Sequence, residues 1–264
     1  MRVIRASNVT AAGFRDNVES VGLTNKKAAA LALMGLGISC LALADDEPQQ
    51  FFQVTKTERL DFPPGGLLRL KNSIGQVMVE GWDRPDVELT TTKSTKDPYN
   101  SQDREKALKE LDQVHIAAER HGDELVITTD FPRYGTFKPL LRGGTRFDLD
   151  YRISVPRNAR VAIEHDTGFV SLENVGGDIR VTASQAEIAL HLPEDGQYAI
   201  EARSRLGDVL SDFPGHMQRK LWFLGKQFAH ENAAASQKID LRAGYGDIMI
   251  LKSRGLKKTA TLPQ

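Results

Sequence analysis

One short pattern constrains this chain more than any other feature: a small residue, one variable residue, then apolar, any, apolar. The pattern recurs six times, starting at Gly75, Gly168, Gly177, Ala186, Gly207 and Gly246. Residues two apart share one face of a β-strand, so the two apolar positions of each copy point the same way. Apart from Ser211, these positions hold only Val, Ile or Leu. The pattern predicts short strands, each led by a small residue at a tight corner.

A single copy is too small to bury its own apolar face, so neighbouring copies must stack. Nine residues separate Gly168 from Gly177, and nine separate Gly177 from Ala186. This step fits alternating sides of a β-solenoid, and the wider gaps further on leave room for loops or extra strands. We expect an all-β, β-solenoid or β-helix-like stack, with a β-sandwich of irregular hairpins as the alternative. Either way, a shared core should hold the apolar residues Val77, Ile179, Ile188 and Ile248.

An insertion separates the first two copies, from about residue 83 to 150. A short helix is expected after Ser101 as its cap, with Ala107, Leu108 and Leu111 on one side. Residues 114–118 and 125–129 alternate around a turn at 121–123 and predict a β-hairpin. Residues 131–147 are expected as a loop, followed by a strand over 148–155.

The N-terminus predicts export. Lys26 and Lys27 precede an uncharged run that ends Ala42-Leu43-Ala44, which is typical of a secretory signal peptide over residues 1–44. A single membrane anchor is the alternative. Cys40, the one cysteine of the chain, lies in this leader, so the remaining domain, 45–264, has no disulfide and no cysteine ligand for a metal. A lipoprotein acylated at Cys40 is the other alternative.

Several segments together resemble a known family. They are residues 151–156, the Gly-x-Val-x-Leu steps over 168–190, residues 207–209, and residues 239–250. These are similar to the bacterial adhesin-like β-strand-repeat domain, a family of exported proteins. The resemblance covers residues 70–251 and implies a β-solenoid-like fold and an envelope location, in the periplasm or at the cell surface. It implies no catalytic residues.

Charge and motifs narrow the classes of function. The whole chain has zero net charge, and residues 45–264 carry 30 basic and 33 acidic residues, which argues against nucleic acid as a partner. No Gly-x-Ser-x-Gly elbow, HExxH helix or phosphate-binding P-loop is present. The six histidines lack the spacing of metal ligands. We expect no cofactor, no metal site and no enzyme.

An acidic residue follows the small corner residue in four copies, as Asp178, Glu187, Asp208 and Asp247. Stacked carboxylates select calcium, which prefers oxygen ligands. Aspartates in turns also accept hydrogen bonds from the backbone amides of their own corner, and this is the interpretation we favour.

Two segments, 131–147 and 214–230, combine basic and aromatic residues and contain no acidic residue. Arginine and lysine fix anionic groups, and aromatic faces accept sugars or acyl chains. The segments predict a binding site for an anionic envelope glycan, a lipid head group or an envelope protein. Its candidate residues are Arg133, Tyr134, Lys138, Arg142, Arg146, Arg219, Lys220 and Trp222. The alternative is an ordinary strand over 221–228, with Trp222 and Phe228 in the core and basic residues protecting a sheet edge.

The sequence therefore predicts a non-enzymatic exported envelope protein, an adhesin-like interaction or structural module that presents loops to envelope polymers or partner proteins. A polysaccharide lyase-like β-helix enzyme and a periplasmic sensor or scaffold are the alternatives. The oligomeric state stays open.

Overall fold

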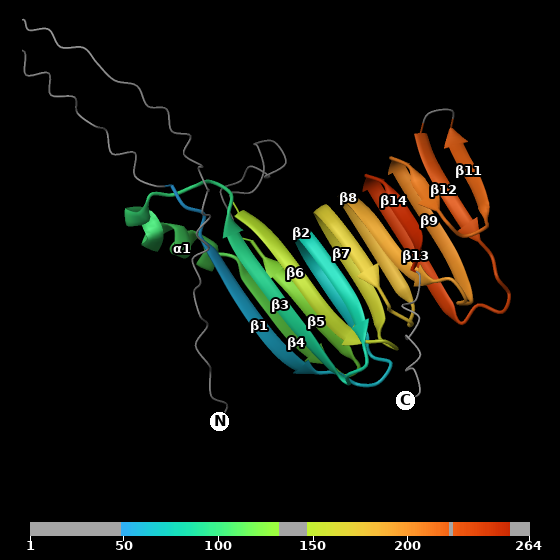
Figure 1. Ribbon diagram of the computed structural model, residues 1–264, viewed down its shortest axis with the longest axis horizontal. Helices are drawn as coiled ribbons and strands as arrows, with labels where there is room; N and C mark the ends of the chain where they lie inside the picture. The colour runs from blue at the N-terminus through green and yellow to red at the C-terminus, as the bar shows by residue number, and fades with distance from the viewer. Residues whose placement is uncertain (1–48, 132–146, 222–223, 254–264) are drawn as a thin grey trace, which may run out of the picture.

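The computed structural model describes residues 49–131, 147–221 and 224–253, and the leader lies outside these ranges. The described chain is mostly β, with one short helix and a large mixed sheet of 14 strands (Figure 1). Within these ranges no helix is both long and apolar enough to cross a membrane. The elements are β1 (Gln53–Asp61), β2 (Leu67–Trp82), β3 (Asp86–Thr95), the 3-10 turn η1 (Ser101–Asp103), α1 (Arg104–Asp112), β4 (His115–His121), β5 (Glu124–Asp130), β6 (Phe147–Pro156), β7 (Arg160–Glu173), β8 (Ile179–Pro193), β9 (Tyr198–Leu206), β10 (Val209–Ser211), β11 (His216–Leu221), β12 (Leu224–His230), β13 (Gln237–Tyr245) and β14 (Ile248–Ser253).

The long strands bend at a small residue, and their two halves pair separately. In β2, residues 67–71 pair in parallel with β5, and residues 76–82 pair in parallel with β6. Strand β8 likewise pairs through its first half with β13 and through its second half with β14. We call two such halves with the corner between them a unit.

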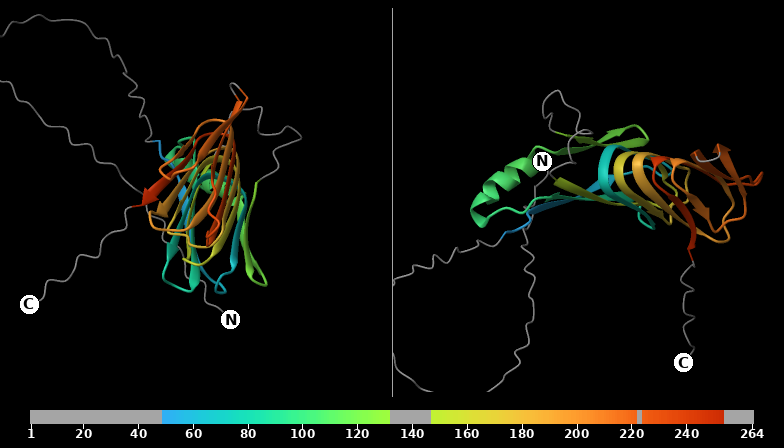
Figure 2. Two further views of the ribbon diagram at one scale, coloured as in Figure 1. Left: turned by 90° about the vertical axis from the view of Figure 1, so that its right-hand side faces the viewer. Right: turned by 90° about the horizontal axis from the view of Figure 1, so that it is seen from above.

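First halves and second halves form two separate series of paired strands. The first halves, with their neighbours, run in the order β4, β5, β2, β7, β8, β13, β9, β12, β11. The second halves run β1, β3, β6, β2, β7, β8, β14, β10. We call these the first and second layers. The two further views show the strands on either side of the interior and α1 at one end (Figure 2).

The spatial order of the units departs from their order in the chain at both ends. The unit β5–β6 comes after β2 in the sequence but pairs on the outer side of β2. Likewise β13–β14, the last unit of the chain, lies between β8 and β9–β10. The central units pair in parallel, unlike the hairpins of the β-sandwich alternative, and antiparallel strands complete each end.

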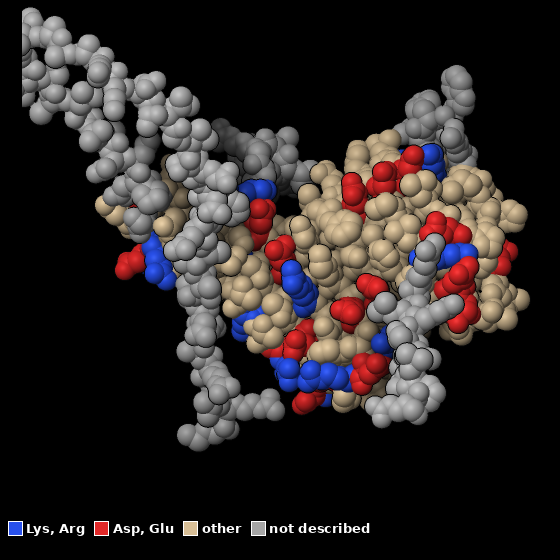
Figure 3. Space-filling model, in the orientation of Figure 1, with Lys and Arg blue, Asp and Glu red and all other residues tan. Residues whose placement is uncertain are grey.

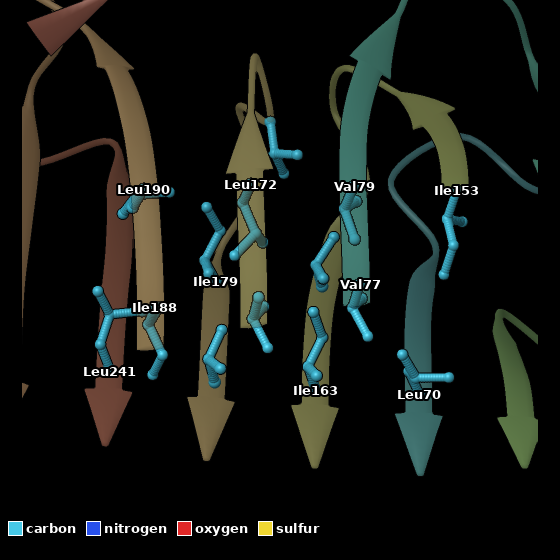
Figure 4. Close-up of a cluster of buried hydrophobic side chains, with 14 of the residues drawn as sticks. Leu70, Val77, Val79, Ile153, Ile163, Leu172, Ile179, Ile188, Leu190 and Leu241 are labelled. Atoms are coloured by element: carbon cyan, nitrogen blue, oxygen red, sulfur yellow. The ribbon is translucent and has the colours of Figure 1, made fainter. Parts of the chain in front are cut away.

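The expected shared core is confirmed. Val77, Ile188 and Ile248 are fully buried and Ile179 is 2% exposed, all in one hydrophobic cluster. The close-up shows side chains from successive strands, among them Leu70 and Leu241, turned towards this common interior (Figure 4). The apolar residues at alternate positions of the repeats are therefore the buried ones.

The segment expected as an insertion forms one end of the sheet. Strand β3 pairs with β1 and β6, and the predicted hairpin is confirmed as β4 and β5. The short helix is confirmed as α1, with Ala107 and Leu111 buried. The expected cap was wrong, because the residues from Ser101 form a 3-10 turn and Asp103 precedes the helix without a side-chain capping bond.

A candidate binding edge at the glycine corners

The corners of successive units stack against one another. Gly168 has φ of +133°, and a Cβ there would lie 1.9 Å from the carbonyl oxygen of Gly75. The same contact recurs from Gly246 to the carbonyl of Ala186, and from Gly207 to the carbonyl of Gly246. Gly168 is also in register with Ala186. These five corners form one continuous edge of the molecule, which we call the corner edge.

Gly177 does not belong to this edge, although the sequence pattern made it equivalent to the others. The residues after it pair with the start of a unit, because Ile179 aligns with Val161 and Ile239. Gly177 instead lies against the backbone of Ala159, in the turn that enters β8. The nine-residue step therefore spans half a unit, so successive steps place strands in the first and second layers in turn.

Two of the four acidic residues that follow a small residue bind backbone amides of neighbouring units. Asp247 accepts a hydrogen bond from the amide of Asp208 (2.7 Å), and Asp178 accepts one from the amide of Lys238 (2.9 Å). The expected bonds to amides of their own corner were wrong for these two, because neighbouring units lie close enough to supply the amides. Asp208 forms an ion pair with Lys226, and Glu187 is exposed. Among the described residues, no three His, Cys, Asp or Glu side chains gather as a metal site.

One ionisable residue lies inside the molecule next to the corners. His165 is 2% exposed, and its Nδ1 lies 2.8 Å from the hydroxyl of Ser73. Its Nε2 is buried without a hydrogen-bond partner. Burial lowers the pKa of His165 to about 4, although backbone groups of Gly75 and Thr167 oppose the shift. His165 is therefore neutral at physiological pH.

Five of the predicted binding residues, Arg133, Tyr134, Lys138, Arg142 and Arg146, lie outside the described residues. The two ends of their segment are described. Phe131 and Phe147 stack with ring centroids 6.0 Å apart and planes 11° from parallel. This contact holds the end of β5 beside the start of β6.

The second predicted segment contains a hairpin rather than the single strand of the alternative interpretation. Strands β11 and β12 pair antiparallel, with Leu221 opposite Leu224. Arg219 and Lys220 lie in β11, the last strand of the first layer, and Trp222 lies outside the described residues. Phe228 is buried, as that alternative expected.

The first predicted segment leaves the sheet at the corner edge, and the β11–β12 hairpin of the second segment turns at the same edge, at the opposite end of the stack. Leu149, just inside β6, places its carbonyl against Gly75. Lys226, near the start of β12, aligns with Ser204 shortly before the corner Gly207 and forms an ion pair with Asp208. In Figure 1 the start of β6 and the end of β11 lie along the same upper edge. The structure thus brings the end of the first segment and the hairpin end of the second to one side of the molecule.

On the face that Figure 3 presents, acidic and basic side chains lie beside one another towards the lower edge, and further charged side chains are scattered among uncharged atoms over the rest of the face. Sequence reasoning missed four arginines on the outer side of the first layer: Arg180, Arg203, Arg205 and Arg242. The available signal was an acid-x-Arg spacing at 201–203 and again at 240–242.

Comparison with known proteins returned structural neighbours alone. No family model and no curated protein matches the chain. The chain resembles a solved structure described as a putative cell adhesion protein from Clostridium sporogenes, with 13% identity, a TM-score of 0.44, and coverage of 76% of this chain and 100% of that one. A putative adhesin from Parabacteroides distasonis has 11% identity, a TM-score of 0.28, and coverage of 74% and 68%. One from Parabacteroides merdae has 10% identity, a TM-score of 0.26, and coverage of 60% and 67%. These three structures are described as putative adhesins or a putative cell adhesion protein, at low identity.

Replacing Gly168 with Ala should destabilise the domain by several times the cost of the same change at Gly122. Both residues have positive φ, and at Gly122, in the left-handed region, this costs about 1 kcal/mol for alanine. Only Gly168 adds a clash with the backbone of the next unit, because nothing lies within 4 Å of a Cβ at Gly122. Denaturant unfolding of the two variants measures the difference. Equal losses would show that the corners are not closely stacked.

His165 should make the domain less stable as the pH falls. An unfolded histidine has a pKa of about 6.5, whereas the folded value is about 4. The unfolded state therefore binds the proton first, and stability is lost from about pH 6.5 down to about pH 4. The full loss is about 3 kcal/mol. Unfolding at several pH values should show this loss in the wild type and a smaller one in His165→Gln, and parallel pH profiles would contradict the assignment.

Proposed function

We propose that this chain is an exported, non-enzymatic, adhesin-like module that presents its corner edge to an anionic envelope polymer. The observation that carries the proposal is the position of the two basic, aromatic segments. The first is held at the corner edge, the hairpin of the second turns there, and a stack of parallel units separates the two. A ligand that reaches both segments must be long, as a polymer is.

The framework suits that role if the units form a solenoid-like column, as we propose. In such a column each unit contacts only its neighbours, so the surface is long and stiff. The parallel registers of β2, β7 and β8 support this arrangement. Stiffness matters for binding, because a preformed surface loses little conformational entropy when a ligand docks.

The predicted site residues supply the chemistry for an anionic partner. Arg133, Arg142 and Arg219 offer planar groups of N–H donors that match carboxylate or phosphate oxygens. Tyr134 and Trp222 offer aromatic faces to sugar rings or acyl chains. The ligand in this proposal is an envelope glycan, with a lipid head group or an envelope protein as the other candidates.

Export should leave a product that begins at Asp45. The full chain, expressed in a bacterium, should reach the envelope fraction after removal of residues 1–44. Replacing Ala42 and Ala44 with Tyr should block the cut, because the peptidase pocket accepts small residues. Intact-mass spectrometry measures the product. A product that begins at Cys40 and carries acyl chains would show a lipoprotein, and an uncut chain in the cytoplasm would contradict export.

The change of Arg133, Arg142, Arg219 and Lys220 together to Ser should weaken binding of the exported protein to isolated envelopes by about tenfold or more. Its control changes Lys56, Arg59, Arg84 and Arg157 to Ser, which removes the same charge from residues held in exposed ion pairs. Co-sedimentation measures both variants. Equal binding of the two would contradict the proposed site. Breakdown of a uronate polymer, followed by absorbance of its unsaturated product, would favour the lyase alternative.

A further inference from the structure

The outer side of three adjacent strands, β8, β13 and β9, carries four arginines. Their neighbours in the chain, such as Val181, Leu241 and Ala202, are buried, so the arginines point to solvent. The side chains of Arg180, Arg242 and Arg203 are 73%, 53% and 46% exposed, and Arg205 is exposed beside them. We call these four residues the arginine surface.

Charges of the same sign lie opposite one another on this surface. Arg242 of β13 is in register with Arg203 of β9, and Asp240 is in register with Glu201. Like charges directly opposite on neighbouring strands destabilise a sheet. On the other side of β13, opposite charges are paired, because Asp240 is in register with Arg180 of β8 and forms an ion pair with it at 3.5 Å. The register of Arg242 with Arg203 therefore has a cost that the ion pairs of this surface offset only in part.

Acidic residues hold two of these arginines in fixed orientations. Asp240 accepts hydrogen bonds from Nε and Nη2 of Arg242, both at 2.9 Å. Glu201 accepts one from Arg203, and the side-chain amide of Gln227 donates to the same carboxylate. A guanidinium has five N–H donors, so each arginine keeps donors for a ligand. Arg205 has no ion pair among the described residues.

The charge balance of the surface is positive but mixed. Lys238 also points outward on β13, and the acidic residues of β9, β13, the first half of β8 and the turn that enters it are Asp178, Asp240 and Glu201, while Glu187 lies exposed in the second half of β8. Asp178 is already bonded to the amide of Lys238. Hydroxyl groups of Thr182 and Ser184, both exposed, lie on the same side of β8. The surface thus offers cationic donors, carboxylate acceptors and hydroxyls together.

We propose that the arginine surface binds a polysaccharide that carries carboxylates, such as a polyuronate. Its carboxylates accept hydrogen bonds from Arg203, Arg205 and Arg242, and its hydroxyls donate to free lone pairs of Asp240 and Glu201. Adjacent strands lie about 4.8 Å apart, so a chain crossing them meets a new row of side chains at each step. Nucleic acid fits less well, because the acidic residues repel closely spaced phosphates. A membrane fits less well, because the only large apolar side chains exposed on the described residues of these three strands are Leu206 and Tyr245, which lie together at the corner end of β9 and β13.

This inference rests on the proposed function, since it assumes the same class of ligand, and it adds a second contact on the sheet to that of the two segments at the corner edge. Different results would contradict the proposed function and this inference. If the protein binds no envelope polymer, the proposed function fails. If binding persists at full strength without the arginine surface, only this inference fails.

The test is the affinity of the full exported protein for alginate, a polyuronate, with neutral dextran as the comparison polymer. Changing Arg203, Arg205 and Arg242 together to Ser should weaken alginate binding about tenfold. Binding of the wild type should fall between about 0.05 M and about 0.5 M salt, because salt screens exposed charges. Calorimetry or biolayer interferometry measures each affinity, and thermal unfolding checks that the variants fold.

A matched control changes Arg59, Arg84 and Arg157 to Ser, which removes three charges from exposed ion pairs on other parts of the sheet. Its alginate affinity should stay within about twofold of wild type. If the triple variant fails to fold, Arg205→Ser alone, which breaks no ion pair, should still weaken binding measurably. Unchanged affinity in the arginine variants, or an equal loss in the control, would overturn the inference. So would tighter binding to duplex DNA or to anionic vesicles than to alginate.

Discussion

The contact between a corner carbonyl and the Cα of the next corner glycine sets the geometry of the whole molecule. Where Gly168 lies against Gly75, and Gly246 against Ala186, no side chain separates the two backbones. The units can then approach to the spacing of hydrogen-bonded strands on both sides of the corner at once. A Cβ at either glycine would force one layer apart from its neighbour. The strands of both layers therefore keep their register from one unit to the next, and side chains of successive units line up in rows.

Those rows explain how one pattern yields both a core and a surface. Inside, aligned aliphatic residues such as Ile188 and Ile250 fill a dry interior. Two polar pairs interrupt it, Ser73 with His165 and Thr129 with Tyr151, whose hydroxyls lie 2.7 Å apart. Burial raises the pKa of Tyr151 to about 12, so it stays neutral. The Ser73 pair lies where the register of β2 against β7 shifts, and it gives Nδ1 of His165 a partner while Nε2 has none.

The same alignment explains what the sequence could and could not predict. Alternation identified the buried positions, because burial of one strand face depends only on residues two apart. The order of the units was not predictable, since the copies at Gly207 and Gly246 have the same local pattern and packing alone decides which one pairs with β8. The prediction that Gly177 forms a corner like the other glycines was wrong for a related reason. A glycine in the turn that enters a strand and a glycine at a corner are both followed by apolar residues at alternate positions. The arginine surface was missed because an arginine on an outer strand face is ordinary by itself. Only the register that places Arg242 opposite Arg203 makes it distinctive.

The ends of the stack bear on where a ligand can bind. An open strand edge invites pairing with another chain, and charged residues or short strands discourage it. Strand β10 has three residues, β11 includes Arg219 and Lys220, and β1 includes Lys56 and Arg59, while α1 packs against β1 and β3. These features disfavour extension of the sheet from its ends. The surfaces best suited to recognition are then the corner edge and the outer side of the layers, where side chains rather than backbone groups make the contacts. The corner contact fixes the spacing of the rows of side chains on both surfaces. A polymer whose repeating units have the same spacing can therefore bind along either surface.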